Sequence, residues 1–412
     1  MASSLVSSTN RVESPFIIAK IGDYTFGHCS DIASKNRMRQ SGMVTFPNFM
    51  NSLTIVKVNG TVNTYTLKMD YVITETDDPN MLEKVFGTVS NTRKIILSYG
   101  DWSAPSYIYK DEECLITQVK SNVDFQASKI SYTIQCVSSS LALRAGVFSF
   151  PPRFAKPSDV IKELLSNETY GLSRIFTGMT KTNSTEVLKL IASDDKAVPL
   201  EAKPGINILE YIGYLVTCMV SLSDPGDKLK SASYFWSVFD DVTNDYGGSY
   251  FKVIKVTTNT TFNLTMDTFE VDVGYPTGNY VSSFSINTDN TWALLYDYAE
   301  SIKQPEYMYY ISDDGNIETF KSPIYTSSSA SLKTTEASKN WWTKVTQYPV
   351  TASLTIKGLL RPSLLMSYVK VNAYFYGHKH ISSGLYIITK QEDVIDSNGY
   401  RTTLSLTRVG SD

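Results

Sequence analysis

The chain contains long stretches in which hydrophobic and polar positions alternate, a pattern typical of β-strands with one buried face. In one such stretch Tyr65, Leu67 and Met69 share a face, and polar residues dominate the other. The Asn59-Gly60 pair before it is a strong signal for a tight turn between two strands. Because similar runs recur up to about residue 145 and from about residue 350 onward, we expect a β-rich fold.

Between about residues 150 and 230 the hydrophobic period changes to that of a helix. One apolar run begins near Ser158 and Asp159, and either residue is a candidate N-cap. A second run follows Asn207, which can cap a helix that carries Glu210 three residues further on. The second helix is apolar on most sides, so we expect it to pack against a neighbouring domain.

The length of 412 residues exceeds the roughly 250–300 residues that a single hydrophobic core usually serves. We therefore expect several domains. The changes of pattern predict a first β-domain, a helical connecting domain, a second β-domain in two pieces and an inserted domain with a flexible Ser/Thr-rich loop. Their boundaries are, in that order, 1–148; 149–230; 231–257 with 346–412; and 258–345.

An internal repeat links the two β-rich ends of the chain. Residues 116–137 align with residues 388–409 at an offset of 272 positions without a gap. The identical pairs are Ile116/Ile388, Thr117/Thr389, Asp124/Asp396 and Val137/Val409. Six further pairs keep similar chemistry: Val123/Ile395, Lys129/Arg401, Ser131/Thr403, Tyr132/Leu404, Thr133/Ser405 and Ile134/Leu406.

The context of the repeat is similar in both places. Each hairpin follows a strand that ends in a Tyr-Gly pair, and each has an earlier "SLTI" segment, at residues 52–55 and 353–356. An internal duplication explains this order, although chance similarity among alternating strands is the alternative. Two like domains per chain would let a three-fold oligomer present six nearly equivalent surfaces, which suits a partner with six-fold symmetry.

Composition and charge exclude several classes of protein. The net charge of −3, the pI of about 5.8 and the lack of a Lys/Arg cluster argue against a basic nucleic-acid-binding face. The longest apolar run, residues 211–220, is too short to span a bilayer, and the first residues lack the features of a signal peptide. Four scattered cysteines without CxxC spacing predict free thiols. We expect a soluble protein made in the cytoplasm.

Candidate catalytic and metal-binding chemistry is sparse. His378 and His380 lie on one strand face but lack a third ligand nearby, and His28 adjoins Cys29 on an extended segment, where neighbours point to opposite faces. We therefore expect no metal, no cofactor and no catalytic residue. Acidic clusters at residues 74–78, 111–113 and 240–241 are most simply solvated loops, although a pair of carboxylates in a sugar cleft is the alternative. The aromatic residues suited to line such a groove are Trp341, Trp342 and Tyr348.

The order of these segments resembles the baseplate hub (tail hub) proteins of bacteriophages and related contractile injection systems, the group that includes late control protein D. The similar segments are "SYGDW" before the first hairpin, "VGYPTGNYVSSFSINTDNTWALLY" in the position of an insertion, and the closing "GLLRPSLLMSYVKVNAYFYGH" with its Gly-Tyr hairpin. The "TSSSASLKTTEASKNWW" segment departs from the family pattern and leaves the size of the inserted domain open.

This resemblance implies a β-rich α+β fold: two tail-tube-like antiparallel β-barrel domains, a helical segment between them and an insertion in the second barrel. It implies a structural, non-enzymatic virion protein of the tail baseplate, assembled in the host bacterial cytoplasm. A homotrimer would form a pseudo-hexameric ring that joins the tail tube protein to the central spike protein and lines the channel. Further candidate neighbours are the tape measure protein and wedge proteins; DNA would only pass through, and no membrane insertion is expected.

The turns of the two repeated hairpins are the expected contact points of such a ring, either between subunits or with the tube. The residues concerned are Asp124, Phe125, Asp396, Asn398 and Gly399. The alternative function is a virion-associated carbohydrate-binding or cell-wall-degrading protein.

Overall fold

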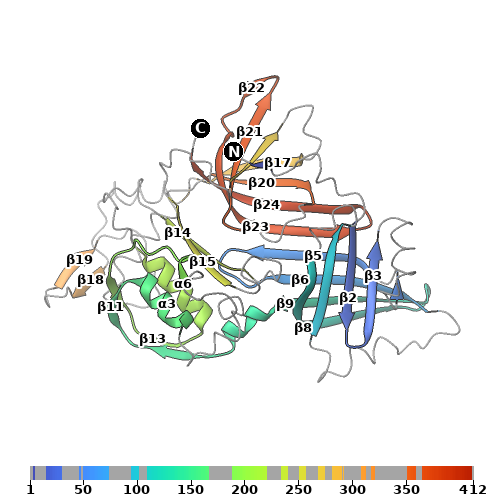
Figure 1. Ribbon diagram of the computed structural model, residues 1–412, viewed down its shortest axis with the longest axis horizontal. Helices are drawn as coiled ribbons and strands as arrows, with labels where there is room; N and C mark the ends of the chain where they lie inside the picture. Colours follow the sequence, from blue (N-terminus) through green and yellow to red (C-terminus); the bar gives the residue numbers. More distant parts are fainter. Residues whose placement is uncertain are drawn as a thin grey trace.

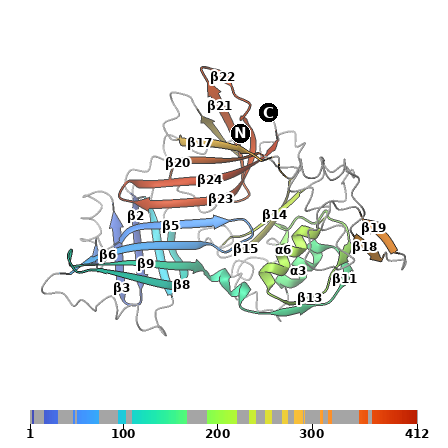
Figure 2. The same cartoon turned by 180° about the vertical axis from the view of Figure 1, so that it is seen from behind.

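The computed structural model describes a β-rich fold with two α-helices in the central part of the chain. The residues described are 3–4, 15–29, 46–47, 50–73, 94–101, 109–166, 188–219, 233–239, 250–256, 268–273, 281–289, 291, 308–311, 317–320, 350–358 and 364–410. Most of the described strands belong to one large, mainly antiparallel sheet (Figures 1 and 2). The β-rich fold expected from the alternating pattern is thus confirmed; the strand pairing does not show closed barrels.

Within the described residues the large sheet has 16 strands, which come from the first and the last parts of the chain. Those from the first part are β1 (Ser3–Ser4), β2 (Pro15–Ile21), β3 (Tyr24–Cys29), β4 (Phe46–Pro47), β5 (Met50–Val58), β6 (Thr64–Val72), β7 (Lys94–Asp101), β8 (Tyr109–Asp124) and β9 (Lys129–Ser138). Those from the second part are β16 (Thr268–Val273), β17 (Val281–Thr288), β20 (Val350–Lys357), β21 (Tyr368–Phe375), β22 (His378–Lys379), β23 (Gly384–Asp396) and β24 (Gly399–Gly410).

The segment between the two parts carries helices and short two-stranded sheets. Its elements are the 3-10 helix η2 (Ser139–Arg144), β10 (Phe148–Phe150), β11 (Arg153–Ala155), α3 (Pro157–Ser166), β12 (Val198–Leu200), β13 (Lys203–Ile206), α6 (Ile208–Cys218), β14 (Ser233–Phe239) and β15 (Tyr250–Val256). A further hairpin joins β18 (Met308–Ile311) and β19 (Ile317–Phe320). In Figure 1 the helices lie beside the large sheet, with β14 and β15 between them and the sheet.

Helix α6 begins as its sequence predicts. The Asn207 side chain accepts a hydrogen bond from the backbone N–H of Glu210 at 2.9 Å, which satisfies one of the free donors of the first turn. The buried Tyr211 ring stacks on Phe150, with 3.7 Å between ring centroids. Helix α6 is buried on most sides because α3, η2 and β14 all contact it.

Helix α3 begins one residue before the predicted caps, at Pro157, so the prediction of Ser158 or Asp159 as N-cap was wrong. A proline is favoured at the first helical position because it has no N–H to satisfy there. The cap comes instead from a distant carboxylate: Asp195 accepts hydrogen bonds from the Ser158 N–H at 3.0 Å and the Ser158 hydroxyl at 2.5 Å.

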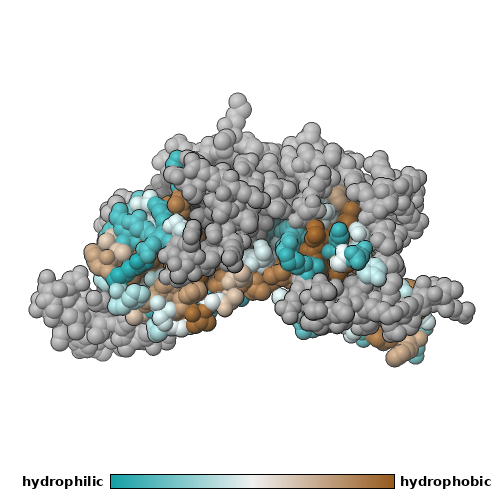
Figure 3. Space-filling view, turned by 60° about the horizontal axis from the view of Figure 1, so that its bottom comes forward, coloured by the Kyte–Doolittle hydropathy of each residue, from teal (hydrophilic) through white to brown (hydrophobic). Residues whose placement is uncertain are grey.

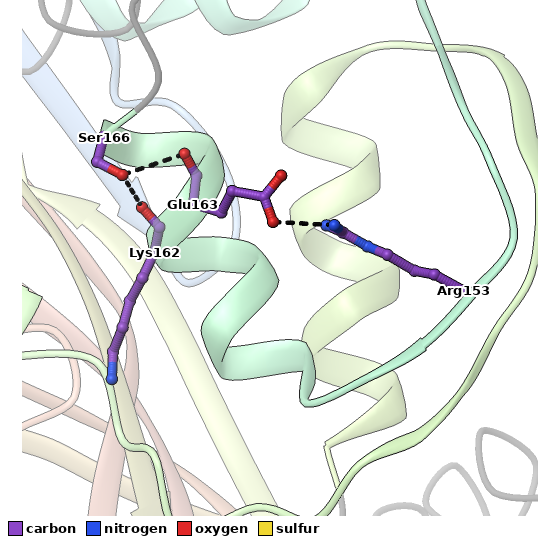
Figure 4. A network of polar contacts seen from close by, with 4 residues as sticks. All are labelled: Arg153, Lys162, Glu163 and Ser166. Atoms are coloured by element: carbon purple, nitrogen blue, oxygen red, sulfur yellow. Dashed lines mark hydrogen bonds and ion pairs between the residues drawn. The ribbon is translucent and has the colours of Figure 1, made fainter.

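The outer side of α3 is tied to the strand that precedes it (Figure 4). Arg153 of β11 forms an ion pair with Glu163 at 2.9 Å. At the C-terminal end, the Ser166 hydroxyl donates to the carbonyl oxygens of Lys162 and Glu163 at 2.8 and 3.2 Å. These contacts satisfy backbone acceptors that a helix end otherwise leaves to water.

The described residues form three large hydrophobic cores and a small fourth cluster of Val256, Leu385, Ile387 and Val409. One holds the helices, one lies in the first part of the sheet and one in the second part. The β14–β15 hairpin joins two of them: Tyr234 and Phe251 pack in the helical core, whereas Phe239 packs in the core of the second part. The predicted domain boundaries stay a prediction; β16 and β17, from the expected inserted stretch, are strands of the large sheet.

We predict that Leu404→Ala lowers the free energy of unfolding by about 2–5 kcal/mol, because Leu404 is fully buried in the core of the second part and its loss leaves a cavity. Urea-induced unfolding measures this effect. Ser405→Ala, at the half-buried next position on the opposite face, is the control and should change stability by less than about 0.5 kcal/mol. Equal effects of the two substitutions would contradict the assignment of faces.

Candidate functional site

The two parts of the sheet contain the same five-strand ladder. In the first part the order is β5-β6-β9-β8-β7, and in the second it is β17-β20-β24-β23-β21. All pairings within both ladders are antiparallel. In this correspondence β5 matches β17, and β8 matches β23. The repeated hairpin predicted from the sequence therefore lies at the same place in two similar ladders.

The two long hairpins also share a local irregularity. The β8–β9 ladder has a bulge at Thr117, and the β23–β24 ladder has one at Thr389, the two positions that the sequence repeat aligned. Each threonine hydroxyl donates to a carbonyl of the opposite strand: Thr117 to Gln135 at 3.0 Å and Thr389 to Ser405 at 3.2 Å. Bulges re-aim the side chains that follow, so the two hairpins bend in the same way.

The predicted alignment without a gap was wrong for the second strand of the hairpin. Asp124 pairs with Lys129 across a four-residue turn, whereas Asp396 pairs with Gly399 across a two-residue turn. Ladder positions in β9 and β24 therefore correspond at an offset of 270, and Ile134 matches Leu404. An error of two residues keeps the inward and outward faces unchanged, which is why the sequence comparison still aligned the buried positions.

The "SLTI" segments do not correspond in the structure. Residues 52–55 lie in β5, at the end of the first ladder, whereas residues 353–356 lie in β20, which pairs directly with β24. Their similarity reflects the restricted amino-acid usage of alternating strands. The two Tyr-Gly pairs do occupy equivalent places in the structure. Each lies at the end of the strand, β7 or β21, that pairs with the repeated hairpin.

The two ladders are joined edge to edge by an antiparallel pairing between β5 and β23. Figure 1 shows these strands side by side at the centre of the large sheet. The pairing runs from Leu53 opposite Ile395 to Val58 opposite Lys390. The bulge at Thr389 makes it possible, because β23 pairs with β21 before the bulge and with β5 after it. We call this pairing the internal junction.

A buried polar cluster lies on the inner face of the internal junction. Lys57 of β5 is opposite Gln391 of β23, and both are fully buried. The Gln391 side chain donates to Asp393 at 2.8 Å, and its oxygen accepts from the Leu364 N–H at 2.8 Å. The Thr402 hydroxyl donates to Asp393 at 2.6 Å. Buried charges require partners of this kind, so the cluster favours this register over its neighbours.

Burial dominates the electrostatics of the cluster. It raises the pKa of the Asp393 carboxyl to about 6, against the opposing effects of the Thr402 hydrogen bond, the Lys57 charge and the hydrogen bonds from Gln391 and Tyr400. The same burial, together with the Asp393 charge, raises the pKa of Tyr400. The carboxyl thus changes its charge state in mildly acidic solution.

The five residues predicted as contact points lie at the tips of the two long hairpins, in two groups. Asp124 accepts hydrogen bonds from the backbone N–H groups of residues 126 and 127, and Asp396 accepts one from Asn398. Both turns, although of different length, thus contain an Asx motif in which the aspartate accepts from the backbone N–H two residues further on. Phe125 is 89% exposed, and Gly399 adopts a φ of 109°, which favours glycine. Their role as contact points stays a prediction.

Other candidate sites from the sequence find no partners that would make them chemical centres. His378 and His380 are exposed, and no group of three or more His, Cys, Asp or Glu is placed to hold a metal in the described part of the chain. Trp341, Trp342 and Tyr348 lie outside the described residues, as do the acidic clusters at 74–78 and 240–241. The expectation of a solvated loop was wrong for the cluster at 111–113, which lies in β8. There Glu112 is buried and accepts hydrogen bonds from the hydroxyls of Tyr65 and Tyr99. No helix among the described residues is long and apolar enough to cross a bilayer.

Several large hydrophobic side chains in the described part of the chain are exposed at the surface. Figure 3 shows hydrophobic residues exposed on one face of the molecule. Exposed large side chains include Val123, Phe125, Ile286, Tyr376 and Ile381. Contiguous exposed apolar surface is a common feature of interaction sites. We therefore take the surface that carries these side chains as the candidate functional site.

Sequence reasoning missed the internal junction and its polar cluster. Alternation identifies which face of a strand is buried, but it does not show which strand is its neighbour. Polar residues on buried faces were an available signal: Lys57 shares a face with Leu53 and Ile55, and Asp393 shares one with Ile395. Such a break in a hydrophobic face indicates a buried partner of opposite charge elsewhere in the chain.

We predict a pH dependence that distinguishes Asp393 from a surface carboxylate. Between about pH 4 and 6 the unfolded chain has lost the Asp393 proton while the folded chain retains it, so wild-type stability falls as pH rises through this window. Relative to Asp393→Asn, the wild type should lose about 2–3 kcal/mol. Glu392→Gln, on the outer face, is the control. Parallel pH profiles for the wild type and Asp393→Asn would contradict the buried assignment.

No protein-family model and no curated protein sequence matches the chain. The fold, however, is similar to that of solved proteins. The 43 kDa tail protein of prophage MuSo2 from Shewanella oneidensis is 9% identical, with a TM-score of 0.50 over 96% of this chain and 98% of that protein. A tail protein from Neisseria meningitidis MC58 is 8% identical, with a TM-score of 0.47 over 95% and 96% of the two chains.

Another similar structure is prophage tail protein gp18 from Listeria monocytogenes EGD-e, at 11% identity and a TM-score of 0.40 over 95% of this chain and 94% of that protein. At such identities a likeness concerns the fold alone. The resemblance to phage tail proteins expected from the sequence is confirmed at that level: over nearly its whole length, the chain has the fold of the prophage MuSo2 tail protein.

Proposed function

We propose that the chain is a structural hub subunit of a phage tail baseplate. Three copies form a pseudo-hexameric ring that joins the tail tube to the central spike and lines the channel between them. The observation that carries this proposal is the pair of matching ladders joined edge to edge at the internal junction. A chain with two matching units presents six near-equivalent units when it forms a trimer.

The fold supports a tail component, because a prophage tail protein shares it over nearly the full length of both chains. The charge is compatible with a channel for passing DNA, since a net charge of −3 offers no strong attraction to phosphate. The protein would act without catalysis, in the virion tail, after assembly in the host cytoplasm. Nothing in the described residues favours the alternative of a carbohydrate-active protein.

The hairpin tips are the surface that we propose for contact with the tail tube protein. Both tips lie at the same end of the large sheet in Figure 1. The first tip presents the exposed Phe125 ring beside Asp124, and the second presents Asn398 beside Asp396. A ring of six such tips would match the six-fold symmetry of a tube. The spike, the tape measure protein and wedge proteins would contact other surfaces.

The test of the ring is the mass of the purified full-length chain in solution. We expect light scattering to give three times the subunit mass of 46.0 kDa, and electron micrographs to show six similar lobes around a channel. Because hydrophobic edges drive the association, the trimer should persist at high ionic strength. A protein that remains monomeric across the accessible concentration range would contradict the proposal.

We predict that Phe125→Asp weakens binding to rings of the cognate tail tube protein by at least about tenfold, because aromatic anchors dominate such interfaces. Folding should be unaffected, since the side chain is 89% exposed. Surface-immobilised tube protein measures the affinity. Tyr376→Asp, at a fully exposed aromatic residue in the turn after β21, is the matched control and should bind like the wild type.

A further inference from the structure

We propose that neighbouring subunits of the ring are joined by a strand pairing between β8 of one chain and β17 of the next, in a register set by the internal junction. This inference rests on the proposed ring and adds its contact surface. The partner is a second copy of this chain. Because the two strands lie at opposite ends of one series of paired strands, the contact is head-to-tail, which can generate a closed ring.

The first observation concerns the edge of β8 that faces away from β9. In the matching strand β23, that edge is occupied along its length: β21 pairs with residues 384–387 and β5 pairs with residues 390–395. In β8, β7 pairs with residues up to Leu115. No strand of the described part of the chain pairs with this edge at residues 118–123, the positions that match 390–395.

The second observation concerns β17, the match of β5. One edge of β17 pairs with β20, as β5 pairs with β6. The two strands even share a bulge, which lies at Asn51 in β5 and at Ser282 in β17. The other edge of β5 forms the internal junction, whereas the other edge of β17 has no partner strand among the described residues. The open edge of β8 thus corresponds to the edge of β23 in the internal junction. The open edge of β17 corresponds to the edge of β5 in the same junction.

The register of the proposed pairing follows from the ladders. Through β6 and β20, Leu53 matches Phe284 and Ile55 matches Ile286. In the internal junction the partners of Leu53 and Ile55 are Ile395 and Asp393. At the hairpin offset of 272, these match Val123 and Ser121. The proposed opposite pairs are therefore Phe284 with Val123, Ile286 with Ser121, and Thr288 with Val119.

Side-chain exposure agrees with this register. At the internal junction Ile55 and Ile395 are both fully buried. Their counterparts Ile286 and Val123 are 38% and 46% exposed, although both lie on the faces that continue the buried side of their sheets. Exposed β-branched residues on an unpaired edge invite pairing with another strand. The proposed pairing would bury both.

The charges on the two edges permit close approach. On the inner face the proposed pairs contain no charged side chain. On the outer face Lys120 would lie opposite Asn287, and Asn122 opposite Ser285, so no like charges oppose each other. Unlike the internal junction, with its buried Lys57 and Asp393, the proposed contact would carry no charge on its inner face.

The geometry of the sheet places the two edges where a ring requires them. The paired strands follow the order β17-β20-β24-β23-β5-β6-β9-β8. Figure 1 shows this series from top to bottom, with β17 and β8 at its ends, and Figure 2 shows the same order from behind. Three copies of the series, joined by β8 and β17, leave neither edge unpaired.

Site-specific cross-linking tests the register. Cysteines at Ser121→Cys and Ile286→Cys, in a chain with Cys29→Ser, should be joined between subunits by a short bis-maleimide, giving covalent dimers and trimers on denaturing gels. The native Cys114, Cys136 and Cys218 are buried and should not compete. Either single-cysteine variant should stay monomeric on the gel.

The control for cross-linking pairs Ser121→Cys with Ser282→Cys. This pair is four positions out of the proposed register, which separates the two cysteines by about 13 Å along the strand. A trimer in solution that cross-links only through the control pair, or through neither pair, would overturn the proposed strand pairing and leave the ring intact. A chain that is monomeric at all concentrations would overturn both.

Charge substitutions provide a second measurement. Val123→Lys or Ile286→Lys should raise the concentration at which the trimer is half assembled on the order of 100-fold, because a lysine would be buried without a partner. The monomer should remain folded, since both side chains are exposed in it. Val147→Lys, at a 70% exposed valine outside both ladders, is the matched control. Assembly that withstands both substitutions at the junction would overturn the pairing.

Discussion

The antiparallel pairing of β5 with β23 is the interaction on which the rest of the structure depends. It joins strands that are more than 300 residues apart in the chain and turns two ladders into one sheet. Its backbone groups would otherwise form two exposed edges. The polar cluster around Asp393 adds selectivity, because a slip of one residue would turn Lys57 away from Gln391 and leave buried charges without partners. The junction is therefore specific in register as well as favourable.

The bulge at Thr389 explains how the β23–β24 hairpin can take part in the internal junction, and Thr117 places an equivalent bulge in the β8–β9 hairpin. At Thr389 the extra residue turns β23, so that its first half pairs with β21 and its second half with β5. Thr117 places the same bend in β8, where β7 pairs only with the part before the bulge. A threonine suits both positions, because its hydroxyl bonds a carbonyl across the ladder. The second half of β8, beyond the part that pairs with β7, is the edge that we propose for the neighbouring subunit.

The sequence predicts those parts of the fold that depend on local pattern. The alternation identified the buried Tyr65, Leu67 and Met69, and the cap of α6 followed from Asn207 and Glu210. Contacts between distant strands could not be predicted, because different strands use the same few residue types. The two "SLTI" segments were aligned wrongly for this reason. The lengths of the two hairpin turns could not be predicted either, because a shift of two residues leaves every side chain on the same face of the sheet. The internal junction is such a contact between distant strands, and no local pattern specifies it.

The two edges that have no partner strand among the described residues support our proposal that the chain is one part of an assembly. Soluble monomers protect sheet edges with charges, prolines or covering loops. The second half of β8 carries Val119 and Val123 on its inward face, and β17 carries Phe284 and Ile286 on the face that matches it. In the alternation of inward and outward residues, β8 matches β23 and β17 matches β5, and these two matching strands pair with each other at the internal junction. A head-to-tail contact between such edges leaves one edge open at each end of any linear assembly, so only closure into a ring satisfies them all.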